Sequence, residues 1–102
     1  MTSESTVPAA DCMTMEEVRA AIDHIDAEIV TLLARRMRYI EAAARIKPHR
    51  DDVRDEPRKA AVIDHACAVA RAEVFPEGLT RQIYELLVEG SIAHELDRFD
   101  QG

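Results

Sequence analysis

Apolar residues recur at steps of four and three along the first half of the chain, which is typical of one face of a long α-helix. The residues of this apolar seam are Val18, Ile22, Ile25, Ile29 and Leu32. Thr14 and Glu17 match a capping box just before the seam. Pro48 disfavours helical backbone at the residue before it. The pattern therefore predicts a first helix of about 32 residues that ends near Ile46 and is roughly 48 Å long.

Two shorter helical segments follow the first. Helical spacing of apolar residues predicts a second helix over about 57–73 and a third over about 80–98. A charged connection at 48–56 and a turn at 75–78 separate the helices. The chain has only 3 Gly, 4 Pro and 4% aromatic residues, which disfavours a β fold. We expect an all-α fold with three helices per chain, the first of them very long.

The chain is long enough for one domain. Residues 1–13 are polar and are predicted to be a disordered tail, and residues 14–102 form a helical domain. The tail lacks the basic start and apolar core of a signal peptide, and no apolar run is long enough to span a membrane. Cys12 and Cys67 lie far apart and match no metal-binding spacing. We expect a protein that is located in the cytoplasm and whose cysteines are reduced.

The length and charge of the chain limit its partners. A helix of about 32 residues cannot bury its seam against the rest of so short a chain, so we expect an intertwined homodimer. With 13 basic and 20 acidic residues the net charge is −7, which argues against nucleic acid or a membrane surface as partner. An anionic ligand would need a local cationic pocket.

Cations occupy positions that the seam would otherwise fill with apolar side chains. Continuing the same steps past the seam leads to Arg36 and then to Lys47. A buried cation is costly unless an anion meets it. Either a ligand supplies that anion, or the two side chains reach solvent or pair with Asp or Glu of another helix. Arg19 lies beside the seam, roughly 42 Å from Lys47 along the helix. The two can meet around one small ligand only across an antiparallel helix pair.

The third helix carries Ser91 and Glu95 on one face. Ser91 is either a ligand contact or a small packing residue, and Glu95 is either a ligand contact or a salt-bridged surface acid. The four histidines show no ligand-like clustering, so we expect no metal site.

The spacing Arg-x16-Arg-x10-Lys, formed by Arg19, Arg36 and Lys47, resembles the all-α, bacterial-type chorismate mutases. That family also contains isochorismate-pyruvate lyases. Residues 53–58 are similar to the family's loop and second-helix start, and residues 88–95 are similar to its third helix. The resemblance covers nearly the whole chain.

The resemblance implies a binding site for a small dicarboxylate, shared between two subunits. Arg19 of the neighbouring chain and Arg36 would bind the two carboxylates of chorismate. Lys47 and Glu95 would donate hydrogen bonds to the ether oxygen while its C–O bond breaks, with Arg36, Lys47 and Glu95 as the catalytic residues. Glu95 falls where the family carries Gln or Glu.

Further site residues are implied on the second and third helices. Arg58 would add a cationic contact to a carboxylate, Asp55 matches an acidic position near the substrate hydroxyl or the loop, and Ser91 matches a polar contact. One position departs from the pattern, because Lys59 stands where the family commonly has an acid that meets the ring hydroxyl.

The activity implied is that of a chorismate mutase, an isomerase of the shikimate pathway that converts chorismate to prephenate in aromatic amino acid biosynthesis. This rearrangement needs no metal and no organic cofactor. One alternative is an isochorismate-pyruvate lyase, which forms salicylate and carries Gln at the position of Glu95. The alternative of another class is a helical dimerisation module without catalytic activity.

Overall fold

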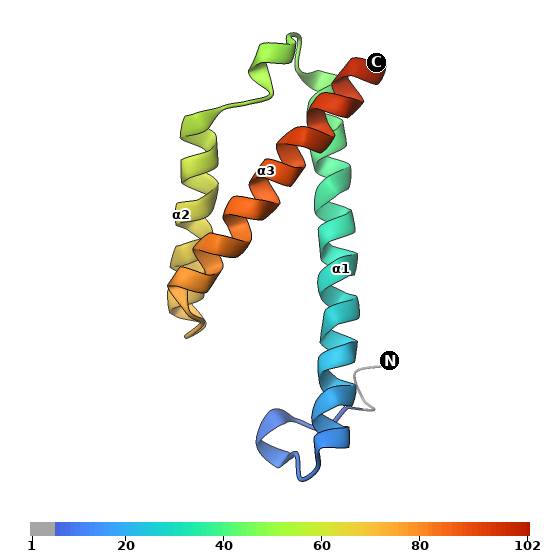
Figure 1. Ribbon diagram of the computed structural model, residues 1–102, viewed down its shortest axis with the longest axis vertical. Helices are drawn as coiled ribbons and strands as arrows, with labels where there is room; N and C mark the ends of the chain where they lie inside the picture. The colour runs from blue at the N-terminus through green and yellow to red at the C-terminus, as the bar shows by residue number, and fades with distance from the viewer. Residues whose placement is uncertain (1–5) are drawn as a thin grey trace. The chain divides into compact units, whose positions relative to one another are not determined.

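The computed structural model describes residues 6–102, and residues 1–5 of the predicted tail lie outside them. The remainder of that tail contains a short 3-10 helix, η2 (Ala9–Asp11). The helices that follow are α1 (Met15–Ile46), the 3-10 helix η3 (Arg50–Asp52), α2 (Glu56–Ala72) and α3 (Glu77–Gln101). Among the described residues no strand is present, so the predicted all-α fold is confirmed (Figure 1).

The chain divides into two compact units, Met1–Met37 and Arg38–Gly102, and the boundary falls inside α1. In the first unit, α1 begins with the predicted capping box. The Thr14 hydroxyl accepts a hydrogen bond from the Glu17 amide at 3.1 Å, and a Glu17 carboxylate oxygen accepts from the Thr14 amide at 3.2 Å. This exchange satisfies amide groups that have no partner within the helix, which explains why α1 begins here.

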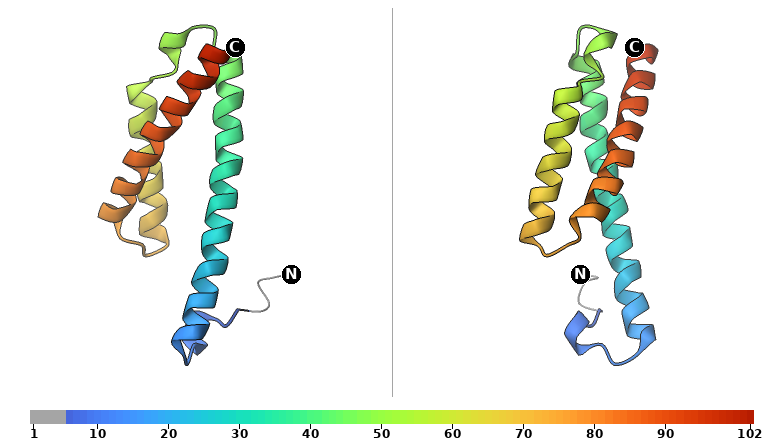
Figure 2. Two further views of the ribbon diagram at one scale, coloured as in Figure 1. Left: turned by 45° about the vertical axis from the view of Figure 1, so that its right-hand side comes forward. Right: turned by 60° about the vertical axis from the view of Figure 1, so that its left-hand side comes forward.

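The second unit is organised around the antiparallel hairpin of α2 and α3, which lie side by side in both views of Figure 2. Its core consists of Val53, Ile63, Cys67, Val88 and Ile92, with Val62, Tyr84 and Leu96 packed against it. α2 begins where the Asp55 carboxylate accepts from the Arg58 amide at 3.0 Å. Val53 reaches the core from the loop before α2, so the α1–α2 connection is anchored to the hairpin.

The turn between α2 and α3 is shorter than the sequence indicated. α3 begins at Glu77 instead of Thr80, and it continues to Gln101 instead of ending at Arg98. Pro76 takes the N-cap position with φ −56°, a backbone angle that suits a helix start. The predicted turn at 75–78 was therefore placed too late, because the proline begins the helix.

Candidate active site

Lys47 lies directly after the last residue of α1. Its amide donates to the Ala43 carbonyl at 2.9 Å, and Pro48 prevents the helix from continuing. A cation at this position also interacts favourably with the negative end of the helix dipole. The amide side of the Lys47 backbone is therefore held by α1, whereas its carbonyl side leads into the loop.

Glu95 is buried in the C-terminal half of α3, with only 4% of its surface exposed. Its Oε2 atom accepts a hydrogen bond from Lys47 Nζ at 2.7 Å. A buried carboxylate is costly unless it is paired, and here the ammonium group at the end of α1 supplies the partner. The structure thus brings together the two side chains that the sequence assigned to the ether oxygen.

The other predicted residues of the second unit lie on α2 and α3. Ser91 is buried one turn before Glu95, and its hydroxyl donates to the Leu87 carbonyl at 2.8 Å. Asp55 caps α2 and so orders the helix start that carries the exposed side chain of Arg58. Ser91 and Glu95 share one side of α3, as their spacing predicts.

Arg19 and Arg36 belong to the first unit. Both lie on α1, where Arg19 is exposed and Arg36 is partly buried. Ile22, Ile25 and Ile29 of the apolar seam each keep about half of their surface exposed. The first unit therefore presents two guanidinium groups on a helix whose apolar face is open.

Lys59, the departure from the family pattern, is committed to ion pairs. Its Nζ atom donates to Glu85 at 2.6 Å and to Glu89 at 2.7 Å. Arg54 also binds Glu89, through two hydrogen bonds of 2.7 and 3.0 Å. The Arg54 guanidinium, followed by the Lys59 ammonium, lowers the pKa of Glu89 to about 2. At this position the cation ties α2 to α3.

Two further charged contacts were not foreseen from the sequence. Arg50 binds Asp100 through two hydrogen bonds of 2.9 and 3.2 Å. His94 Nε2 donates to Glu41 at 2.7 Å, and this hydrogen bond lowers the pKa of Glu41. Complementary charge is the only sequence signal for such pairs, and it does not say which acid meets which base across some fifty residues.

The arrangement suits the binding and polarisation of an anionic substrate. An ammonium group and a carboxyl group converge at the end of α1, and a protonated carboxyl would be a second hydrogen-bond donor. Residues 6–102 contain no cluster of three or more His, Cys, Asp or Glu side chains that could hold a metal ion. None of the described helices is long and apolar enough to cross a membrane.

The second unit thus contains a helical hairpin whose buried glutamate is paired with the lysine at the end of α1. The family model described as chorismate mutase type II matches residues 18–96, and the chain belongs to this family. An isochorismate pyruvate lyase from Pseudomonas aeruginosa is 34% identical over 88 residues, which cover 82% of this chain and 87% of that protein. The chain is therefore an enzyme of the chorismate mutase family.

Proposed function

We propose that this enzyme is an isomerase that converts chorismate to prephenate. The observation that carries the proposal is the 2.7 Å contact between Lys47 and Glu95, because two side chains this close could both donate to one ether oxygen. The match of the chorismate mutase family model over residues 18–96 supports the same reaction class.

The rearrangement breaks a C–O bond and forms a C–C bond within one molecule, so it requires neither a nucleophile nor a general base. The protein accelerates it by holding a compact conformer of the substrate and by stabilising negative charge that develops on the ether oxygen. The Lys47 ammonium donates to that oxygen, and Glu95 donates when its carboxyl is protonated. Each preorganised donor of this kind contributes a factor of about 10²–10³ to the rate.

The carboxylates of the substrate would be bound by guanidinium groups. Arg36 and Arg58 of one chain, together with Arg19 of a second chain, would form the cationic side of the pocket. Guanidinium groups suit this role because they bind a carboxylate through two parallel hydrogen bonds. Ser91 and Asp55 would border the remainder of the substrate.

The second chain is expected to be another copy of this protein. The α1 seam leaves about half or more of Ile22, Ile25 and Leu32 exposed, and α3 exposes Ile83 and Leu86. Apolar stripes of this length are normally covered by a partner. An antiparallel homodimer would cover the seam and would bring Arg19 of each copy into the site of the other.

Isochorismate-pyruvate lyase activity is the second candidate, and the Pseudomonas aeruginosa relative favours it. Isochorismate is also a cyclic dicarboxylate with an enolpyruvyl ether, so the same cations would bind it. The family pattern expects Gln in the lyases at the position where this chain has Glu95. That residue is our reason for placing the mutase first.

The test offers chorismate and isochorismate separately to the purified protein. We expect prephenate from chorismate, whereas salicylate and pyruvate from isochorismate would assign the lyase. Lys47→Ala is expected to lower kcat/KM by a factor of about 10²–10³ without loss of helix content by circular dichroism. Arg71→Ala, which removes a charge from the other end of the hairpin, should retain activity. Conversion of neither substrate by the native protein would favour a dimerisation module, and equal activity of native protein and Lys47→Ala would remove Lys47 from the catalytic role.

A further inference from the structure

The loop between α1 and α2 is tied to α3 by every Lys and Arg side chain that residues 47–54 contain. The three contacts join Lys47 to Glu95, Arg50 to Asp100 and Arg54 to Glu89. The loop carries Lys47 at one end and leads to Asp55 and Arg58 at the other. Its conformation therefore sets the position of several proposed site residues at once.

Substrate binding would affect these three ion pairs differently. If Lys47 donates to the ether oxygen of the substrate, its hydrogen bond to Glu95 is weakened in favour of a hydrogen bond to the ligand. The start of the loop then needs another contact to keep the Lys47 backbone in place. Arg50 is the nearest residue in the loop that can supply it, because Arg54 lies beyond Val53, which is already buried in the hairpin core.

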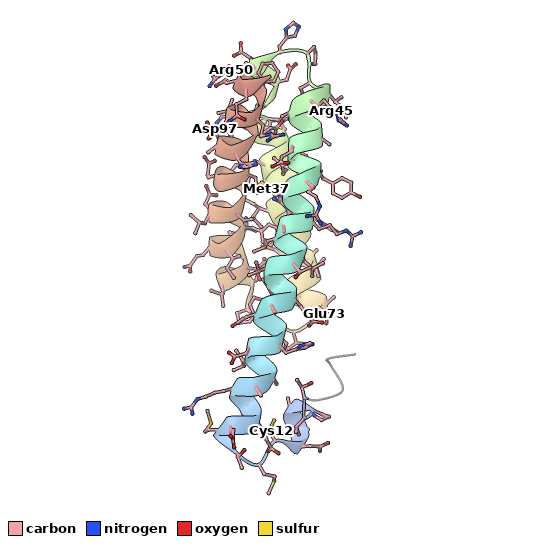
Figure 3. The ribbon with its side chains drawn as sticks, turned by 90° about the vertical axis from the view of Figure 1, so that its right-hand side faces the viewer. Cys12, Met37, Arg45, Arg50, Glu73 and Asp97 are labelled. Atoms are coloured by element: carbon pink, nitrogen blue, oxygen red, sulfur yellow. The ribbon has the colours of Figure 1, made fainter. Side chains whose placement is uncertain are left out.

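The contact between Arg50 and Asp100 is a bidentate ion pair. Arg50 Nε donates to Oδ1 at 2.9 Å and Nη2 donates to Oδ2 at 3.2 Å, so both carboxylate oxygens are engaged. Asp100 belongs to the last turn of α3, and Figure 3 shows Arg50 at the same end of α3 as Asp97. The two side chains are 55% and 50% exposed, which makes the contact sensitive to salt and to single substitutions.

The hydrogen-bonded backbone around Arg50 connects this ion pair to Lys47. Arg50 begins η3, and the His49 amide donates to the Asp52 carboxylate at 3.2 Å. The Asp52 amide donates in turn to the His49 carbonyl at 3.0 Å. This turn is a short rigid unit, and Pro48 restricts the chain between it and Lys47. A shift of Arg50 therefore moves the backbone from which Lys47 extends.

We propose that Arg50 and Asp100 form a positioning pair that keeps Lys47 aligned for catalysis while its bond to Glu95 is exchanged for a bond to substrate. The inference rests on the proposed function and extends it to two residues that do not touch the reacting atoms. The pair acts on the loop, so its effect should appear both in catalysis and in the protection of the loop amides.

The test compares Asp100→Arg, Arg50→Asp and the double variant that exchanges the two charges. Each single variant should lower kcat/KM by about tenfold and should speed amide hydrogen exchange at residues 49–53. The double variant should recover most of both losses, because it restores an ion pair between the same positions. The thermal midpoint should change little in all three variants, since the pair is half exposed.

The matched control is the pair of Arg71 and Glu77, whose atoms approach to 3.0 Å at the opposite end of the hairpin with comparable exposure. Reversing either of these charges should leave kcat/KM and exchange at residues 49–53 unchanged. The proposal is overturned if the single Arg50 and Asp100 variants behave like this control, or if the exchanged pair recovers neither activity nor protection. If the native protein converts neither substrate, the proposed function fails, and the exchange measurement alone still decides whether the pair holds the loop.

Discussion

Glu95 is the residue about which the sequence and the structure together say most. Its position on α3 and its likeness to a family position were readable from the sequence, but its burial and its 2.7 Å bond to Lys47 were not. Helical periodicity predicts which face of a helix carries a residue. Which segment packs against that face depends on the path of the connecting loop. The roles of Arg19 and Arg36 also stay predictions, since the proposed site combines Arg36 of one chain with Arg19 of a second chain.

Glu95→Gln separates donation from charge at this position. A carboxyl donates only when protonated, whereas an amide donates at every pH. We expect Glu95→Gln to retain most of the native kcat/KM, because its amide can donate to the ether oxygen, and Glu95→Leu to lose a factor of about 10²–10³. The measurement is kcat/KM of the three proteins at one pH. A Glu95→Leu variant as active as Glu95→Gln would remove Glu95 from the role of donor.

Val74 is a second residue with a measurable consequence. It has φ +57°, a left-handed conformation that is costly for a β-branched side chain, and it is 91% exposed. It follows α2 in a turn closed by a 2.8 Å bond from the Phe75 amide to the Ala70 carbonyl. Val74→Gly should raise the free energy of unfolding by about 0.5–1 kcal/mol, measured by urea denaturation. Val74→Ala, which keeps a Cβ atom, should gain less, and an equal gain in both variants would contradict the strain.

At the scale of the elements, the helices were more predictable than their ends and contacts. The Thr14 capping box and Pro48 bounded α1 correctly, because both act through local backbone chemistry. The start of α3 was missed by three residues, since Pro76 can end one segment or begin the next. Val69 of α2 keeps 47% of its surface exposed, which helical spacing of apolar residues alone does not indicate.

The α2–α3 hairpin should lose stability in acid. Hydrogen bonds from Arg54 and Lys59 hold the pKa of Glu89 at about 2, below its ordinary value of 4.5. A carboxylate with a lowered pKa in the folded state stabilises that state above about pH 4.5, and this contribution is lost as the pH falls toward 2. Glu89→Gln should therefore be less stable than the native protein at pH 7, and the difference should shrink between pH 4.5 and 2. Thermal midpoints across this range test it, and a constant difference would contradict the assignment.

At the scale of the whole molecule, an acidic chain is proposed to bind a dianion. The net charge of −7 opposes such binding at long range, so the cations must be concentrated locally. Within residues 47–59, the acids of α3 bind several of the available cations, whereas Arg19 and Arg36 belong to the other unit. The proposed homodimer would bring the cations of two chains to one substrate. Because one chain is small, the proposed site would need cations from two chains.

Subunit mixing tests this account most directly. Arg19→Ala and Lys47→Ala are each expected to be nearly inactive, and they are mixed in equal amounts, unfolded together and refolded. Random pairing makes half of the dimers mixed, and each mixed dimer has one site with native Arg19 and Lys47, so about a quarter of native activity should return. Activity no greater than the sum of the two separate variants would show that Arg19 and Lys47 of different chains do not serve one site.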